Sequence, residues 1–312
     1  MKTTILTDIS TRLKPCVATI GFFDGVHKGH RFLIRQVLDM ASERGLGSAV
    51  ITFDQHPRQV LDCNFRPLML STHAEKTALL AATGIDECVV LPFNKEMAAM
   101  EARDFMQKVL AERLNVRVLV TGYDNRFGHN RTEGFSDYVA YGREIGMEVV
   151  QAEALRLDGV GVSSSVIRTL LGEGEVEMGT RCLGYPYMLT GTVVKGEQVG
   201  RSIGFPTANL LPDDNCKLIP APGAYAVRVA LPDRQGQLAG MMNIGSRPTF
   251  DGQKTTLEVN IFNFDGDIYG CRMGVSFVSR LRAERKFRNG GELAAQLKRD
   301  AEEAMARLGQ HG

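Results

Sequence analysis

Residues 21–30 read Gly-Phe-Phe-Asp-Gly-Val-His-Lys-Gly-His, and the segments on either side of this stretch decide the fold of the first half of the chain. Residues 17–20, Val-Ala-Thr-Ile, form a short apolar run that is typical of a buried strand. After the stretch, apolar side chains recur near the helical period at Phe32, Leu33, Val37, Leu38 and Ala41. The sequence therefore predicts a strand, a glycine-rich turn and an amphipathic helix in direct succession.

The composition of this turn suits a phosphate group. Gly21, Gly25 and Gly29 allow a tight turn and a close approach of the backbone to a ligand. The start of a helix offers free N–H groups and the positive end of the helix dipole. His27 and His30 lie at or just before the first helical turn, where two imidazoles can flank one anion. The alternative from this stretch alone is a glycine-rich connection with two surface histidines.

Residues 1–181 alternate between strand-like and helix-like segments. The predicted strands cover residues 16–22, 47–53, 87–92, 116–121 and 147–152. The predicted helices cover residues 29–44, 74–83, 101–114, 133–146 and 164–172. This order is typical of a Rossmann-like α/β domain, an open parallel sheet with helices on both faces. Ligands bind such sheets beyond the carboxyl ends of the strands, where we expect residues 21–30, 54–57 and 122–128.

Residues 182–312 have a different rhythm. Residues 224–231 and 257–264 alternate or run apolar, and hairpin-type turns are indicated at Asp233-x-x-Gly236 and Asp265-Gly266. Strands at this spacing predict a small antiparallel β-barrel. A terminal helix is indicated by an apolar stripe at Leu293, Leu297, Ala301, Ala304, Met305 and Leu308. We place the border near residues 172–183, where the helical pattern gives way to Gly-Glu-Gly-Glu, and divide the chain into domains 1–181 and 182–312.

The composition is that of a globular protein. At 312 residues the chain is long for one hydrophobic core, and 44% hydrophobic with 23% charged residues is ordinary for such proteins. No run approaches the roughly 18 apolar residues of a membrane span, and the first residues lack the apolar core of a signal peptide. The six cysteines are scattered without metal-like spacing, which favours free thiols. We therefore expect a cytoplasmic protein without a membrane partner.

The charge balance argues against binding of nucleic acid. The net charge is +1, with 21 Lys and Arg against 23 Asp and Glu in residues 1–181, and 16 against 13 in residues 182–312. Neither half has the basic surplus of a nucleic-acid-binding domain. The densest basic cluster is interrupted by Glu284 and is typical of a solvated face, or of contact with a small anion. It comprises Arg280, Arg282, Arg285, Lys286 and Arg288.

A second phosphate motif is indicated at residues 162–168, Val-Ser-Ser-Ser-Val-Ile-Arg. Serines before an apolar run are typical helix N-caps, and capping alone is one interpretation. The other adds hydroxyl and N–H groups that hold phosphates, with Arg168 one turn along as a fixed charge. Together with residues 21–30, this motif would form a two-part phosphate clamp.

Two further segments follow predicted strands. Thr-Phe-Asp-Gln-His-Pro at residues 52–57 is a proline-stiffened loop that can wall a pocket. Gly-Tyr-Asp-Asn-Arg-Phe-Gly at residues 122–128 follows the strand at 116–121. For each of them, an ordinary strand-exit turn is an equal alternative.

In the second half, Gly-Phe-Pro-Thr-Ala-Asn at residues 204–209 suggests a cation site. Pro206 biases Phe205 towards extended backbone, so that Thr207 and Asn209 project to the same side. A hydroxyl and an amide oxygen are suitable ligands for Mg²⁺ when phosphate and water complete the shell. The alternative is a turn with a side-chain hydrogen bond.

Glu258 is the candidate general base. In a strand over residues 256–264, Glu258 and Asn260 face away from Leu257, Val259 and Ile261. A carboxylate on the inner face of a barrel is costly unless it is solvated or paired, and there it is a candidate base for a hydroxyl nucleophile. An outward-facing glutamate on a half-solvated strand fits the pattern equally well.

Taken in order along the chain, these motifs resemble the bacterial bifunctional riboflavin kinase/FMN adenylyltransferase family, also called FAD synthetase. The segments similar to the adenylyltransferase half are residues 21–30, 52–57, 122–128 and 163–168. Those similar to the kinase half are residues 204–210, residues 243–250, Glu258 and Tyr269-Gly270. The resemblance covers nearly the whole chain.

The resemblance implies a two-step synthesis of FAD. The second half would phosphorylate the ribityl 5′-hydroxyl of riboflavin from MgATP and give FMN. The first half would join FMN to AMP from a second ATP, releasing pyrophosphate and FAD. Mg²⁺ is then the cofactor and ATP a co-substrate, and the partners are riboflavin, FMN, FAD and ATP rather than nucleic acid or a membrane. The oligomeric state stays open.

The resemblance also implies roles for individual residues of the first half. His27, His30 and Arg168 would be catalytic. His56 and Pro57 match a loop on the flavin side of the site. The residues implied to bind nucleotide or phosphate are Gly21, Phe22, Asp24, Gly29, Asp124, Ser164 and Ser165.

In the kinase half, Thr207 and Asn209 match the pair that binds Mg²⁺ and nucleotide, and Glu258 matches the catalytic base. Arg282 falls where the family closes a loop over the flavin. Two residues depart from the family pattern. Asn125 stands where an aromatic residue is usual, and Asn260 stands where histidine is frequent, so the pocket wall and the surroundings of Glu258 are expected to differ there.

Three other functions are possible alternatives, and they differ in the residues or the reaction that they require. The nearest is a monofunctional adenylyl- or cytidylyltransferase whose second domain only binds or regulates. Such a domain would need neither the Mg²⁺ pair Thr207 and Asn209 nor the base Glu258. An oligonucleotide-binding barrel is disfavoured by the near-neutral halves and the absence of tryptophan. A flavin storage or sensor protein would differ by consuming no ATP.

Overall fold

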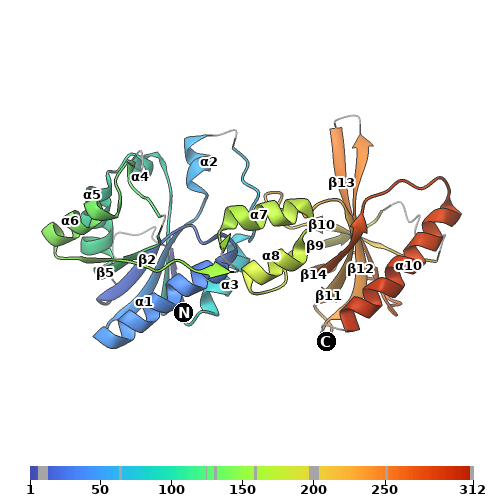
Figure 1. Cartoon of the computed structure of the whole chain (residues 1–312), viewed down its shortest axis with the longest axis horizontal. Helices are drawn as coiled ribbons and strands as arrows, with labels where there is room; N and C mark the ends of the chain where they lie inside the picture. The colour runs from blue at the N-terminus through green and yellow to red at the C-terminus, as the bar shows by residue number, and fades with distance from the viewer. Residues whose placement is uncertain are drawn as a thin grey trace. The chain divides into compact units, whose positions relative to one another are not determined.

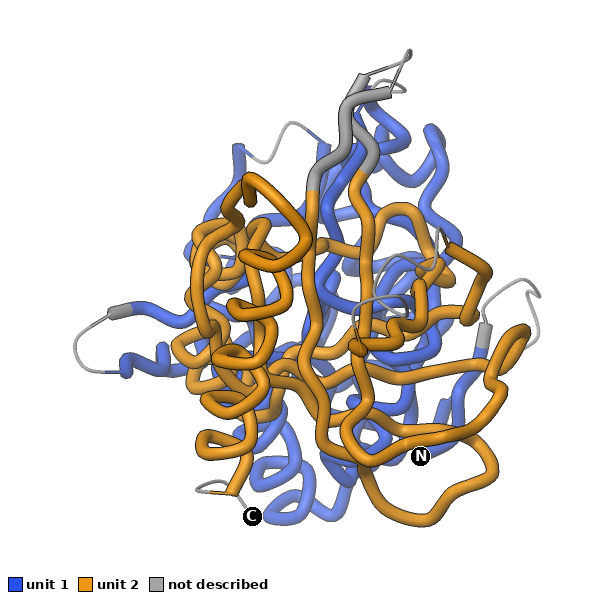
Figure 2. Tube along the Cα trace, turned by 90° about the vertical axis from the view of Figure 1, so that its right-hand side faces the viewer, with its two compact units in different colours: residues 1–164 blue, residues 165–312 orange. Residues whose placement is uncertain are grey.

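The computed structural model describes residues 1–5, 13–62, 65–123, 125–129, 132–157, 160–196, 204–249 and 252–309. These residues form two units, residues 1–164 and residues 165–312, which are described separately (Figure 2). Within the described ranges, no helix combines the length and the apolar content that crossing a bilayer requires.

A six-stranded sheet lies at the centre of the first unit (Figure 1). Its strands are β1 (Lys2–Ile5), β2 (Cys16–Ile20), β3 (Gly47–Phe53), β4 (Glu87–Leu91), β5 (Val116–Thr121) and β6 (Glu148–Gln151). They lie in the order β1-β4-β3-β2-β5-β6, and every pairing is parallel. The predicted open parallel sheet is confirmed.

Helices cover both faces of this sheet. On one face α1 (Lys28–Arg44) and α3 (His73–Ala81) bury the alternate side chains Val17 and Val50. On the other face the layer is α5 (Ala102–Asp104), the π-helix η2 (Phe105–Arg113) and α6 (Phe135–Ile145). Shorter elements are η1 (Asp24–Val26), α2 (Pro57–Leu61), α4 (Lys95–Ala98), β7 (Arg156–Leu157) and β8 (Val160–Gly161). Because neighbouring residues of a strand point to opposite faces, two apolar layers require nearly continuous apolar strands.

The sheet has a topological switch point. The chain passes from β2 through β3 to β4 on one side and then returns to β5 on the other side of β2. Ligands of such sheets bind where the strand order reverses, beyond the carboxyl ends of the strands. Residues 21–30 follow β2 and residues 122–128 follow β5, so both predicted segments begin at this point.

Several elements of the first unit differ from expectation, among them β1, the helical segment at residues 101–114, and the short elements α2, α4, β7 and β8, which were not predicted. β1 was not predicted, because Lys-Thr-Thr-Ile carries a single strongly apolar residue and pairs only with β4 at the sheet edge. Residues 101–114, predicted as one α-helix, form the short α5 and then the π-helix η2. A π-helix differs from an α-helix by one residue per hydrogen-bonded turn, which apolar spacing does not distinguish.

The second unit is built on a closed antiparallel barrel. Its strands are β9 (Met188–Val194), β10 (Ala208–Pro212), β11 (Gly223–Ala230), β12 (Leu238–Thr249), β13 (Gly252–Ile261) and β14 (Arg272–Ala283). They close in the order β10-β13-β12-β11-β14-β9. The terminal helix α10 (Gly290–Gly309) lies along the barrel (Figure 1). The predicted barrel with a C-terminal helix is confirmed.

The prediction that Met305 belongs to the apolar stripe of α10 is wrong. Ala304 and Leu308 are buried and belong to a core cluster with Ala226 and Met241 of the barrel. Met305 is 49% exposed. Adjacent residues of a helix are about 100° apart, so a position next to Ala304 turns towards solvent.

Two helices precede the barrel, α7 (Ser164–Glu173) and α8 (Val176–Leu183). α8 lies within the predicted border at residues 172–183, where we expected the helical pattern to end. Gly174, with φ of 86°, forms the turn between the two helices. The acidic residues on either side of it resemble a linker, whereas Val176, Cys182 and Leu183 are buried.

Arg280 holds this helix pair on the barrel. Its Nη1 atom donates to the carbonyl of Glu173 at 2.8 Å, and its Nη2 atom donates to that of Pro222 at 3.0 Å. A Cβ atom at Gly174 would lie only 2.5 Å from Nη1, so the turn needs glycine to approach the guanidinium. The interpretation of this arginine as part of a solvated face is therefore wrong.

Removing the apolar contact of α10 should destabilise the second unit. Leu308→Ala is expected to lower its free energy of unfolding by about 2–5 kcal/mol, because it leaves a cavity in the buried cluster. Met305→Ala, on the same helix but exposed, should change it by less than about 0.5 kcal/mol. Urea unfolding followed by circular dichroism measures both, and equal effects would contradict this packing.

Candidate active sites

The turn after β2 has an unusual backbone. Phe23, Gly25 and Val26 have φ angles of 55°, 75° and 35°, the last of which is rare for a β-branched residue. Of the three glycines expected to allow a tight turn, only Gly25 has a positive φ angle, and Gly21 and Gly29 do not. At Gly29 a Cβ atom would lie 3.0 Å from the carbonyl oxygen of Val162, and this close approach is what glycine allows.

Asp24 fixes this turn. Its carboxylate is buried and accepts the backbone N–H groups of Leu70 and Ser71 at 3.0 Å. The Ser71 hydroxyl in turn accepts the N–H of Gly25 at 2.9 Å. The carboxylate predicted to serve nucleotide binding is thus engaged with the protein's own backbone. Phe22 and Gly21 precede it, and the N–H of Gly21 donates to the carbonyl of Ile51.

His27 and His30 form a stacked pair. Their ring centroids are 3.6 Å apart, with an angle of 18° between the planes. His27 is the N-cap of α1, and its Nδ1 atom accepts the backbone N–H of His30 at 3.3 Å. Because Nδ1 accepts, this imidazole carries its proton on Nε2.

His30 is kept neutral. Burial, and then the charges of His27 and Lys76, hold its pKa well below the ordinary value for histidine. Its Nδ1 atom is buried and has no hydrogen-bond partner among the described residues. The site thus presents a neutral His30 imidazole, stacked on His27, beside the first turn of a helix.

Lys76 is a residue of this site that the sequence did not reveal. It reaches from α3 and is only 4% exposed, with its Nζ atom 4.4 Å from the centre of the Phe22 ring. Burial lowers its pKa to about 8. In the sequence it follows Glu75 in an amphipathic helix, a pattern typical of a solvated lysine.

His56 and Pro57, the residues predicted on the flavin side, form the N-terminus of helix α2. His56 is the N-cap of α2, where its ring accepts the N–H of Arg58, and Pro57 occupies the first helical position. The His56 ring lies 4.9 Å from that of Phe22 and 5.5 Å from that of Phe65. These rings suit a planar aromatic ligand.

The segment after β5 is only partly described. Asp124 lies outside the described residues. Asn125 donates from its side-chain amide to the carbonyl of Ile20 at 2.5 Å, so this residue links the ends of β5 and β2. Gly128, with φ of 93°, has a Cβ position 2.8 Å from Ala102 and therefore requires glycine.

The second phosphate motif begins α7. The hydroxyl of Ser164 donates to the backbone carbonyl of Asp24 at 3.0 Å, which differs from a simple capping role. Ser165 is exposed, and half-buried Arg168 lies one turn further along the same helix. The boundary between the two units falls between Ser164 and Ser165.

In the second unit, Glu258 lies on the outer face of the barrel. In β13 it pairs with Asn209 of β10 on one side and with Asn243 of β12 on the other. Its neighbours Leu257 and Val259 are buried in the barrel, so the outward orientation holds and the inner-face alternative is wrong. Because residues directly opposite in a sheet share a face, the Asn209 amide lies beside the Glu258 carboxylate.

Two cavities meet at Thr207. The larger, about 590 Å³, is lined by Pro206, Thr207 and the turn over residues 264–269. The smaller, about 240 Å³, is lined by Thr207, Glu258 and residues of α10. Asn209 does not line either cavity, and its amide packs against Gly196, where a Cβ atom would lie 2.1 Å away.

Asn260 supports this junction. Its side-chain amide donates to the carbonyl of Pro206 at 2.7 Å, and the residue is 7% exposed. The amide therefore holds the turn that presents Thr207. The departure from histidine at this position leaves a hydrogen-bond donor in place.

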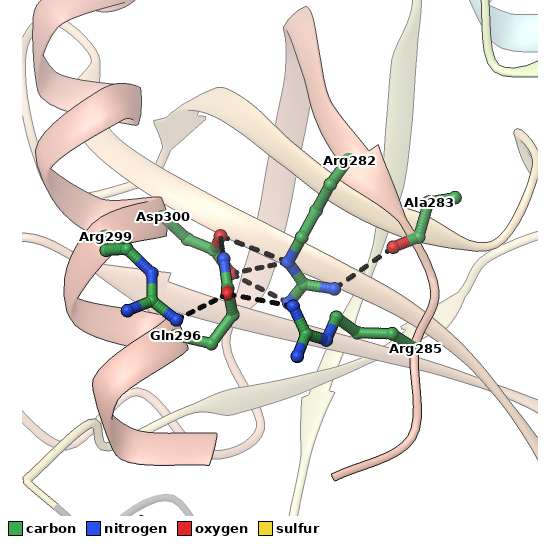
Figure 3. Close-up of polar contacts among 6 residues, drawn as sticks. All are labelled: Arg282, Ala283, Arg285, Gln296, Arg299 and Asp300. Carbon is green, nitrogen blue, oxygen red and sulfur yellow. Dashed lines mark hydrogen bonds and ion pairs between the residues drawn. The ribbon is translucent and has the colours of Figure 1, made fainter. Parts of the chain in front are cut away.

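Arg282 forms a wall of the smaller cavity and is fixed by α10 (Figure 3). Its Nε and Nη2 atoms donate to the carboxylate of Asp300 at 3.0 and 2.7 Å, and Asp300 is 2% exposed. Gln296 donates to the same carboxylate at 2.7 Å. Sequence reasoning missed Asp300 and Gln296, because they stand among many charged residues of an amphipathic helix.

Comparisons with known proteins identify one family model in each half of the chain. Residues 9–166 match the family model described as FAD synthetase, and residues 183–308 match the model described as riboflavin kinase. The bifunctional riboflavin kinase/FMN adenylyltransferase of Escherichia coli (strain K12) is 35% identical over 285 residues, which cover 91% of this chain and 90% of that protein. The chain belongs to the bifunctional riboflavin kinase/FMN adenylyltransferase family.

The relative from Bacillus subtilis (strain 168), of the same description, is 35% identical over 93% of this chain and 91% of its own. A crystal structure described as a macrolide-efflux protein from Streptococcus pneumoniae is 32% identical, has a TM-score of 0.88, and covers 97% of this chain and 98% of its own. The two family models and the bifunctional relatives assign transferase activities, riboflavin kinase and FMN adenylyltransferase, both of which use ATP.

The salt bridge in Figure 3 should be essential to the kinase domain. Asp300→Asn is expected to cost about 3 kcal/mol of stability, because Arg282 loses its buried partner, and to raise the KM for riboflavin. Glu303→Gln removes an exposed pair with Arg307 on the same helix and should cost less than about 1 kcal/mol. Urea unfolding and kinase kinetics test the pair, and the same loss in both variants would refute this role.

Proposed function

We propose that the two sites catalyse successive steps from riboflavin to FAD, each with its own set of residues. Riboflavin and ATP would give FMN and ADP at the barrel, and FMN and a second ATP would give FAD and pyrophosphate at the parallel sheet. The observation that supports this most directly is that Thr207 lines two cavities, the smaller of which is also lined by Glu258. A phosphoryl donor and an alcohol acceptor need such adjoining spaces.

At the barrel, Glu258 would accept the proton of the ribityl 5′-hydroxyl as that oxygen attacks the terminal phosphorus of ATP. The larger cavity, bounded by residues 264–269, would hold the nucleotide. The smaller cavity, with Arg282 in its wall, would hold the flavin. Because Arg282 already shares its charge with Asp300, its flat guanidinium would serve as a surface for the planar ring.

Mg²⁺ fits the donor groups at this junction. Thr207 offers a hydroxyl and Asn209 an amide oxygen, which are hard ligands of the kind Mg²⁺ prefers. These two residues would hold the ion together with the phosphates of ATP. When bound, Mg²⁺ neutralises charge on the phosphates. In the chain itself, Asn209 lies on β10 directly opposite Glu258, and Thr207 immediately precedes that strand.

At the parallel sheet, His27 and His30 would contact the phosphates of ATP at the start of α1. Ser164, Ser165 and Arg168 would add hydroxyl groups and one positive charge, since they begin α7. His56 and Pro57 would lie on the flavin side. The remaining contacts to nucleotide or phosphate are proposed for Gly21, Phe22, Gly29 and Asp124, whereas Asp24 would act by holding the turn. This chemistry is positioning and charge neutralisation.

We further propose that the chain works in the cytoplasm on small molecules, as domains 1–181 and 182–312. Cys16, Cys88, Cys216 and Cys271 form no disulfide, which fits a reducing compartment. Burial raises the pKa of the Cys16 thiol to about 12 and that of Cys88 to about 11, so neither is a thiolate at neutral pH.

Glu258→Gln should abolish FMN formation, because the amide cannot accept the proton of the hydroxyl. FAD formation from supplied FMN should stay unchanged. Glu302→Gln, an exposed residue of the same unit, is the matched control and should retain both activities. Chromatography of flavins after incubation with ATP and Mg²⁺ measures each step. Equal loss of the two activities in Glu258→Gln would overturn the proposed division.

His30→Ala should stop the second step, so that FMN accumulates from riboflavin while FAD does not form. The physical reason is the loss of a phosphate contact at the start of α1. The same chromatographic assay applies, and FMN output from the untouched barrel reports on the amount of folded protein. Unaltered FAD production would remove this histidine from the mechanism.

A further inference from the structure

Lys76 is a buried cation whose three donor positions are all used. Its Nζ atom donates to the carbonyl of Phe53 at 3.1 Å, to the hydroxyl of Thr52 at 3.2 Å and to the carbonyl of Phe22 at 3.3 Å. An ammonium group has three N–H bonds, so this arrangement satisfies it completely. The side chain therefore holds one position rather than sampling many.

These three acceptors lie where two neighbouring strands end. Phe22 follows β2 and opens the turn that leads to the histidine pair. Thr52 and Phe53 are the last residues of β3, directly before the segment that leads to His56. The Thr52 hydroxyl also donates to the carbonyl of Phe22 at 3.1 Å. One ammonium thus ties together the two loops proposed to bind ATP and flavin.

The charge of Lys76 is not explained by packing. Moving an ammonium out of water costs several kcal/mol even after relaxation, whereas an apolar side chain of the same length would fill the space without this cost. Among the described residues, no carboxylate lies within ion-pair distance of Nζ, although Asp24 and Asp54 act on it through space. A buried cation beside a phosphate site is stabilised when the anion binds.

We propose that Lys76 is a positioning residue of FMN adenylylation, which sets the ends of β2 and β3 relative to each other. This inference rests on the proposed role of His27 and His30. It adds a group that touches no substrate, since its ammonium is enclosed by protein.

The groups around His30 agree with this role. His27 stacks on its ring at 3.6 Å, Phe23 meets it edge-on at 5.0 Å, and Lys76 contributes a positive charge from α3. The surroundings of Lys76 are Asp24, Asp54, the thiol of Cys88, and His73, whose pKa Lys76 also helps to lower. The positive charge of Lys76 disfavours a second positive charge on His30, so this imidazole stays neutral.

Lys76→Met tests the inference, because methionine keeps the length of the side chain and removes both the charge and the donors. Adenylylation of FMN should fall about 10- to 100-fold in kcat, since the loops lose their common anchor. Kinase activity of the same chain should not change. Lys108→Met, the same substitution at an exposed position of the first unit, should leave both activities intact.

A pH profile separates this role from a merely structural one. Removing a nearby positive charge raises the pKa of His30, so the acid limb of kcat/KM for adenylylation should move to higher pH in Lys76→Met. Lys76→Arg keeps the charge and should restore the limb to its original position. A purely structural lysine would lower the activity at every pH and leave the limb in place.

The outcomes are distinct. Suppose that His30→Ala abolishes adenylylation, but Lys76→Met retains full activity and the acid limb of its pH profile does not move. The inference on Lys76 is then wrong, while the proposed histidine site is supported. If His30→Ala has no effect, the histidine site itself fails. If circular dichroism shows that Lys76→Met does not fold, the acid limb of the pH profile is measured for Lys76→Gln instead and is interpreted in the same way. Glutamine keeps a hydrogen-bond donor but removes the charge.

Discussion

The carboxylate of Asp24 accepts two backbone N–H groups from residues 70 and 71 while it lies in a turn with three positive φ angles. For the two residues among these that are not glycine, Phe23 and Val26, such a conformation costs about 1–3 kcal/mol each, so the turn persists only when its surroundings hold it. Hydrogen bonds to a buried charge are about twice as strong as neutral ones, which makes Asp24 suitable for this task. The stacked histidines, the start of α1 and the hydrogen bond from Ser164 all depend on the path that this turn takes.

In the barrel, too, buried polar side chains hold the groups around the proposed site. Asp300 is buried on α10 and holds Arg282 at the wall of the smaller cavity, while the amide of Asn260 holds the turn before Thr207. In both units a buried polar group positions backbone or a second side chain, and the groups proposed to meet substrates stand at strand ends or on the outer face of a strand. The scaffold is therefore rigid at the positions where phosphoryl chemistry requires it.

The elements that the sequence predicted are those with an unambiguous apolar period. β3 and β5 match their predicted bounds, because each is a β-prone run buried on both faces. The orientation of Glu258 could not be predicted, since its outward-facing side chain lines a cavity that residues of α10 also line, and this cavity is formed by segments distant in sequence. Lys76 and Asp300 could not be found for a related reason. Burial of a charged residue is decided by partners distant in sequence, Phe22 for the one and Arg282 for the other.

At α7, the domain boundary drawn from packing differs from the boundary that keeps the proposed adenylylation residues together. The matches to the two family models leave residues 167–182 between them, and these residues form most of α7 and α8. Arg280 fixes their turn on the barrel through Glu173 and Gly174, so the helix pair belongs structurally to the second unit. Ser165 and Arg168, proposed for adenylyl transfer, are carried on the first of these helices. A cut that follows packing falls after Ser164, whereas a cut that keeps the proposed adenylylation residues together must fall beyond Arg168.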